Sequence, residues 1–154
     1  MDIYLFGEIG MAVRVRIKVE VINTGKEVET NALVNTGFET EKPQLLIPLK
    51  MAEELGLWPP PHGTPMIEME TAGGPVKNYL ISNAIQVYLI TKDRIIGPVV
   101  CDAILSHIEE EVLINDKLGE ELKITILRMG EGIWRFYDDP EGITRKSTSP
   151  QYWI

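Results

Sequence analysis

The stretch Ala32-Leu33-Val34-Asn35-Thr36-Gly37 decides the fold expected for this chain. It comes after a long alternating run, residues 11–21, and a turn at Thr24-Gly25. Such alternation is typical of a half-buried strand, here with the valines and the isoleucine on one face and the charged residues on the other. The sequence therefore predicts a hairpin whose second strand, residues 28–34, ends in a turn at Asn35.

The apolar residues followed by Asn35-Thr36-Gly37 form a pattern that resembles the signature of the retropepsin-like aspartic peptidases, in which Asp-Thr-Gly follows such residues. The resemblance covers roughly residues 13–127 and implies a closed β-barrel that acts as a homodimer. In this family each chain supplies one turn, and two aspartates meet at the dimer axis. The resemblance makes Asn35, Thr36 and Gly37 the catalytic positions, with Asn35 in the place of the aspartate. The tripeptide alone also suits an ordinary turn.

The side chain of Asn35 has the shape of aspartate but no carboxylate to take up a proton. Two close carboxylates share one proton, which lets one activate a water while the other protonates the scissile carbonyl. Loss of general acid–base catalysis lowers a rate by about 10²- to 10⁴-fold. We therefore expect an aspartic endopeptidase homologue that is inactive or nearly so. The alternative is a non-catalytic module of the same fold that binds peptides or proteins.

A second hairpin is predicted over residues 66–90, with its tip at Thr71-Ala72-Gly73-Gly74-Pro75. A glycine pair between two apolar strands favours a long hairpin with a mobile tip. In the family that the chain resembles, the matching hairpin is the flap that folds over a bound peptide. An ordinary surface hairpin is the alternative. By the resemblance, the expected substrate-binding residues of the flap and of the turn are Thr71, Ala72, Gly73, Gly74 and Phe38.

Residues 46–57 and 113–124 are similar at a constant offset, with six of twelve aligned residues identical. Residues 48–55 predict a short helix that begins at a proline and is stopped by Gly56. The similarity is either a coincidence of two amphipathic helices or an internal duplication of the fold.

Members of the family carry two apolar residues and a glycine before the later helix. Leu113-Ile114 match the apolar pair if Asn115 takes the place of the glycine, and Val112-Leu113 match it if Ile114 does. By the resemblance, Leu113 and Ile114 are expected to line the peptide cleft beside the turn.

Two further apolar strands are predicted at residues 85–89 and 95–105, joined by a turn at Lys92-Asp93-Arg94. Asp102 lies in the second of them and is expected on its open face. The alternative is that Asp102 supplies the carboxylate that Asn35 lacks.

Composition excludes several classes of protein. The chain has 154 residues, a net charge of −8 and one cysteine, Cys101. Acidic proteins rarely bind nucleic acid, and a lone cysteine forms no internal disulfide and fits a cytoplasmic protein. No apolar run is long enough to cross a membrane, and His62 and His107 lack the spacing of metal ligands. We expect no cofactor and no metal.

The organisation expected is one retropepsin-like domain, residues 1–140, and a tail, residues 141–154, docked on the body or on a partner subunit. The tail ends in Tyr152-Trp153-Ile154, and exposed aromatic residues of this kind favour docking. Together with residues 3–6 they are the expected dimer interface. The fold class is all-β with one or two short helices, a closed barrel that forms a homodimer around an extended peptide. A structural barrel without a cleft is a third hypothesis.

Overall fold

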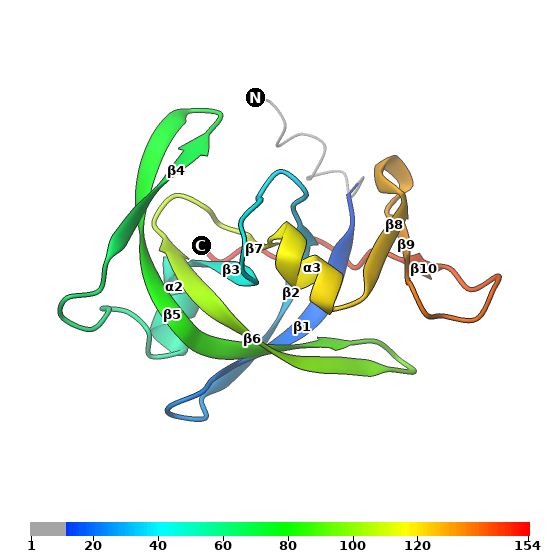
Figure 1. Ribbon diagram of the computed structural model, residues 1–154, viewed down its shortest axis with the longest axis horizontal. Coiled ribbons are helices and arrows are strands. Elements are labelled where there is room, and N and C mark those ends of the chain that lie inside the picture. Colours follow the sequence, from blue (N-terminus) through cyan, green and yellow to red (C-terminus); the bar gives the residue numbers. More distant parts are fainter. Residues whose placement is uncertain (1–11) are drawn as a thin grey trace.

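A computed structural model describes residues 12–154 (Figure 1). Its strands are β1 (Arg14–Val21), β2 (Glu27–Val34), β3 (Gln44–Pro48), β4 (Met66–Thr71), β5 (Gly74–Ile90), β6 (Ile95–Ser106), β7 (Val112–Ile114), β8 (Ile124–Arg128), β9 (Ile133–Phe136) and β10 (Arg145–Lys146). Its helices are α2 (Leu49–Glu54), α3 (Asp116–Glu121) and the 3-10 turn η1 (Met129–Glu131). In this part of the chain, no helix combines the length and the apolar character needed to cross a membrane.

Six strands close into a barrel. They are hydrogen-bonded in the order β1-β2-β7-β3-β6-β5, and β5 pairs back with β1. Each of these six strands therefore has a hydrogen-bonded strand on both sides along part of its length. Strand β4 extends β5 as a hairpin outside the ring, and β8, β9 and β10 form a second, three-stranded sheet at its side (Figure 1). The predicted all-β class, short helices and closed barrel are confirmed.

The first hairpin has the predicted strands. β1 and β2 pair antiparallel from Arg14 opposite Leu33 to Glu20 opposite Glu27. Ile17 and Val19 are completely buried inside the barrel, because successive side chains of a strand point to opposite faces.

One residue of that hairpin departs from the expected pattern. Arg14 was expected on the charged outer face, but only 1% of it is exposed. Its guanidinium donates to both carboxylate oxygens of Glu111, which precedes β7, and the Nη2–Oε2 distance is 3.2 Å. A buried charge requires such a partner, so the outer face of β1 is covered at this end of the barrel.

The repeat seen in the sequence is also a repeat in the structure. Helices α2 and α3 occupy the same positions within the two aligned segments, and each follows a strand of the barrel. After each helix the chain takes a left-handed conformation, with φ of 73° at Gly56 and 67° at Lys123. Strands β3 and β7 pair antiparallel beside each other. These shared features favour internal duplication over coincidence.

Strand β5 joins the outer hairpin to the barrel. Its 17 residues form one continuous strand. The sequence indicated two separate strands here, one in the outer hairpin and one at residues 85–89 in the barrel. The register with β6 shifts between Ile81 and Ile85, and Asn83 at this shift has a φ of 47°. The irregularity is a bulge, which bends and twists a strand without ending it.

The tail lies along the body of the same chain. Arg145 and Lys146 pair with β9 as strand β10, so the tail expected from residue 141 contributes a strand to the second sheet. Farther on, Asn31 donates its backbone N–H to the side chain of Gln151, and the indole of Trp153 donates to Thr30. Residues 3–6, the other part of the expected interface, lie outside the described residues.

Gly97 shows how closely β5 and β6 approach. A Cβ atom at this position would lie 2.6 Å from the carbonyl oxygen of Val87, and the φ of Gly97 is 122°. We expect Gly97→Ala to lower the free energy of unfolding by about 2–4 kcal/mol, since it adds both backbone strain and a clash. Urea unfolding measures this loss.

Gly63→Ala is the matched control for this substitution. Gly63 also has a positive φ, 86°, but no atom lies within 4 Å of its Cβ position. Its replacement should cost about 1 kcal/mol, from backbone strain alone. Equal losses in the two variants would contradict the close approach at Gly97.

Candidate functional site

The turn after β2 is held by the side chain of Asn35. The Oδ1 of Asn35 accepts a hydrogen bond of 3.0 Å from the backbone N–H of Gly37. The backbone N–H of Asn35 donates to the carbonyl of Ile114 in β7, also at 3.0 Å. An aspartate could accept the same bond from Gly37, because its carboxylate oxygen has the same position as the amide oxygen. Thr36 and Gly37 are exposed, and Asn35 is half-buried.

A row of apolar side chains crosses the outside of the barrel next to this turn. Strand pairing places five residues side by side on successive strands. They are Leu33 (β2), Leu113 (β7), Leu46 (β3), Ile104 (β6) and Leu80 (β5). Phe38 packs against this row and is 6% exposed. Because Leu33 and Asn35 are two positions apart, they lie on the same side of the chain.

The outer hairpin contributes to the same cluster. Ile67 and Met69 of β4 pack on the group formed by Phe38, Leu46, Ile104 and Leu113. The hairpin and the loop of residues 35–43 extend from the same end of the barrel (Figure 1). The structure therefore brings one face of the hairpin together with the residues that follow the Asn35 turn.

The tip of the hairpin is built as the sequence indicated. Thr71 pairs with Gly74, and the hydroxyl of Thr71 accepts a hydrogen bond from Gly73 N–H at 3.2 Å. Thr71, Ala72 and Gly73 are exposed. Within residues 12–154, no hydrogen bond joins this tip to Asn35, Thr36 or Gly37.

Two of the expected cleft residues face in opposite directions. Leu113 belongs to the outer cluster with Phe38. Ile114 is completely buried in the main core inside the barrel, so it has no surface to offer a peptide and the prediction for this residue is corrected. Leu33, Ile67 and Met69 also pack on the outer cluster, and they are not among the residues expected there from the sequence. The two-residue period of strand side chains could have indicated them: Leu33 is counted back from Asn35, and Met69 and Ile67 are counted back from Thr71.

Asn115 follows Leu113-Ile114 and caps helix α3. Its side chain is completely buried. The amide oxygen accepts from the backbone N–H groups of Gln44 and Leu118, and the amide nitrogen donates to Thr40 Oγ1 and to the carbonyl of Lys42. Asn115 thereby ties the loop that leaves the Asn35 turn to β3 and α3.

Asp102 is not on an open face of β6, as the sequence analysis expected, but is 1% exposed. Its Oδ1 accepts from the backbone N–H of Asn83 at 2.9 Å and lies 3.2 Å from the ammonium of Lys42, while its Oδ2 accepts from Gln44 at 3.0 Å. Burial raises the pKa of Asp102, but these hydrogen bonds and the charge of Lys42 outweigh it, and the net pKa is lowered. Both oxygens thus serve the structure, which argues against Asp102 as a rescuing carboxylate.

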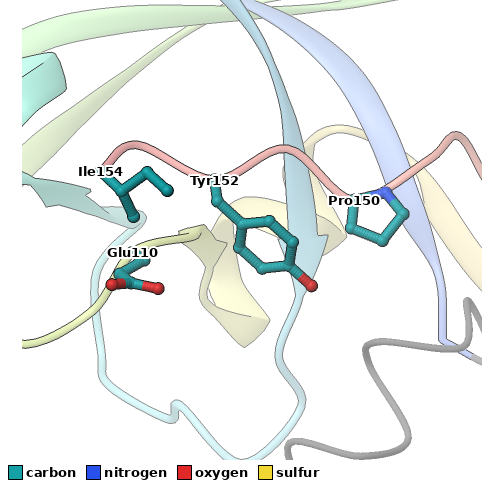
Figure 2. A pocket seen from close by; sticks show the side chains of 4 residues that line it. All are labelled: Glu110, Pro150, Tyr152 and Ile154. Atoms are coloured by element: carbon teal, nitrogen blue, oxygen red, sulfur yellow. The ribbon is translucent and has the colours of Figure 1, made fainter.

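Two hollows lie elsewhere on the surface. One of about 500 Å³ is lined by Glu110, Pro150, Tyr152 and Ile154, and Figure 2 shows that its wall combines the tail with the segment before β7. The other, about 190 Å³, is lined by Leu49, Trp58, Met66, Lys77, Asn78, Tyr79, Leu105 and His107. Neither lining includes the Asn35 turn. Among residues 12–154, no group of three or more His, Cys, Asp or Glu side chains is arranged to hold a metal ion.

The sequence matches no model of a known protein family and no curated protein. Any functional assignment therefore depends on the residues of the turn, the apolar cluster and the hairpin. Of these, the turn presents the Asn35 side chain, and the cluster and the hairpin lie beside it.

Phe38 is expected to hold the turn in place. Phe38→Ala removes a buried ring from the outer cluster, which typically costs about 3–5 kcal/mol of stability. Glu39→Ala, at the exposed neighbouring position, should change stability by less than about 0.5 kcal/mol. Thermal or urea unfolding of both variants measures the difference, and a small loss for Phe38→Ala would mean that the cluster does not anchor the turn.

Proposed function

We propose that this protein is a retropepsin-like aspartic peptidase homologue that binds extended peptides in a cleft at the axis of a homodimer. As the sequence stands, it has little or no peptidase activity, because Asn35 occupies the position of the aspartate. We place it in the cytoplasm, where the buried thiol of Cys101 stays reduced.

The observation that carries the proposal is the arrangement of the Asn35 turn and the β4–β5 hairpin around one apolar cluster. The turn presents Asn35, and the hairpin covers the residues beside it. An extended peptide lying between them could add to the strand edge of β4 and place its side chains against the half-buried Leu33 and Met69. Backbone hydrogen bonds would then give affinity, and the apolar row would give specificity.

A second copy of this chain is the partner that the proposal requires. One chain supplies a single apolar-Asn-Thr-Gly turn, and a two-fold axis would bring two such turns together. Exposed apolar side chains support association at the C-terminal side, where Ile108 is 53% and Ile154 is 81% exposed. Ile154 lines the hollow formed by the tail and Glu110.

The alternative is a non-catalytic peptide- or protein-binding module with the same fold. It is favoured by the amide of Asn35, whose oxygen accepts the turn hydrogen bond without any titratable group. Both functions use the same cleft. They differ in whether the fold supports catalysis once a carboxylate stands at position 35.

The dimer is tested by a charged substitution at its expected interface. Ile154→Asp should raise the dimer dissociation constant by about tenfold or more, since a charge buried in an interface without a partner is unfavourable. Sedimentation velocity across the micromolar range measures the constant. The matched control is Ile95→Asp on β6, where the isoleucine is 68% exposed and no interface is expected. If the unaltered protein is a monomer at micromolar concentration, the homodimer proposal fails.

The chemistry is tested by Asn35→Asp. This variant restores two carboxylates that must share a proton, so their titration splits into two steps. We expect cleavage of unfolded protein substrates at a rate at least about 10²-fold above the unaltered protein, with a bell-shaped pH profile on the acid side. Inhibitors of aspartic peptidases should abolish it.

Asn23→Asp, at the exposed turn between β1 and β2, is the matched control and should cleave nothing. A folded Asn35→Asp dimer that binds peptides but does not cleave them would favour the binding module. Cleavage by the unaltered protein would mean that another carboxylate acts, and Asp116 would be examined first because it lies beside the loop and accepts from Thr40 N–H.

A further inference from the structure

The carboxylate of Asp102 holds the irregular part of β5. It accepts the backbone N–H of Asn83, which lies at the bulge and has a left-handed φ of 47°. A residue at a bulge lacks a ladder partner, and Asp102 supplies one. Since β5 runs from the hairpin tip into the barrel, this bulge is the root of the hairpin.

A continuous series of hydrogen bonds leads from this root to the loop after Asn35. Gln44 donates its side-chain amide to Asp102 at 3.0 Å and its backbone N–H to Asn115 at 3.0 Å. Asn115 then donates to the hydroxyl of Thr40 at 2.8 Å. Asp102, Gln44 and Asn115 are all buried, so water does not compete for these bonds and each is stronger than on the surface.

We propose that Asp102 is a positioning residue that couples the root of the β4–β5 hairpin to the loop of residues 38–42. A peptide that orders the hairpin would also stabilise the loop that leaves the Asn35 turn. This effect of a bound peptide rests on the proposed function. The coupling itself is a property of the single chain and needs no peptide.

Hydrogen exchange of the backbone amides tests the first half of the proposal. In Asp102→Ala the amide of Asn83 loses its acceptor, and its exchange should accelerate about tenfold or more. The amide of Thr40, which is bonded to Asp116, should accelerate as well. Amides of the barrel interior, such as Val19, serve as the reference for any change in global stability. Asp102→Asn keeps a neutral acceptor, should show a smaller rise at Asn83, and carries the test if the alanine variant does not fold.

The second half of the proposal is that a change in the loop affects the root of the hairpin. It is tested at Thr40, the last residue of the hydrogen-bond series. Thr40→Val removes one of the two acceptors of the Asn115 amide nitrogen without touching the hairpin, and we expect Asn83 exchange to accelerate several-fold. Thr24→Val is the matched control, since Thr24 accepts a local hydrogen bond at the β1–β2 turn and should leave Asn83 unchanged. Combined with Asp102→Asn, Thr40→Val should have a non-additive effect.

Unchanged exchange at Asn83 in both Asp102 variants would overturn the positioning role. Acceleration at Asn83 in the Asp102 variants without any response in Thr40→Val, or strictly additive effects in the double variant, would overturn the coupling. Failure of the protein to bind peptides would count against the proposed function and leave these exchange results intact.

Discussion

The buried amide of Asn115 is the group on which the site depends most. Two N–H groups donate to its oxygen and its nitrogen donates to two oxygens, which is the full hydrogen-bonding capacity of an amide. A buried polar group satisfied in this way favours one arrangement of its neighbours, because any other leaves it without partners. Asn115 thereby fixes β3, α3 and the loop that returns from Asn35 relative to one another.

The duplication gives the barrel two related strand ends. β2 runs parallel to β7, and β6 runs parallel to β3. The matching pairs are Leu33 with Leu113 and Ile104 with Leu46. Ser106 is therefore the counterpart of Asn35, and its hydroxyl also accepts a hydrogen bond from the N–H two residues later. The two related strand ends therefore share this hydrogen bond and differ in the group that accepts it, an amide oxygen at Asn35 and a hydroxyl at Ser106.

Local patterns in the sequence predicted the strands and helices. They did not predict which charged side chains are buried by partners from distant parts of the chain. The two hairpins and helix α2 follow from alternation, glycine pairs and Gly56, signals that span a few residues. Arg14 and Asp102 occupy strand positions where charged residues usually face water, and their partners Glu111 and Asn83 are remote in sequence. Which of Leu113 and Ile114 faces inward depends on the register of β7 with β2, since adjacent strand residues face opposite ways.

The position of β7 has a consequence for how the chain folds. This three-residue strand lies between β2 and β3, although the segment from residue 35 to residue 111 separates it from β2 in the sequence. The ring of strands is complete only after β7 has paired with both β2 and β3. Pairing between such distant segments slows folding, because the loop must be closed before any contact rewards it. A chain in which β7 has not yet inserted exposes two apolar strand edges, so its partly folded states are expected to be the species most prone to aggregation.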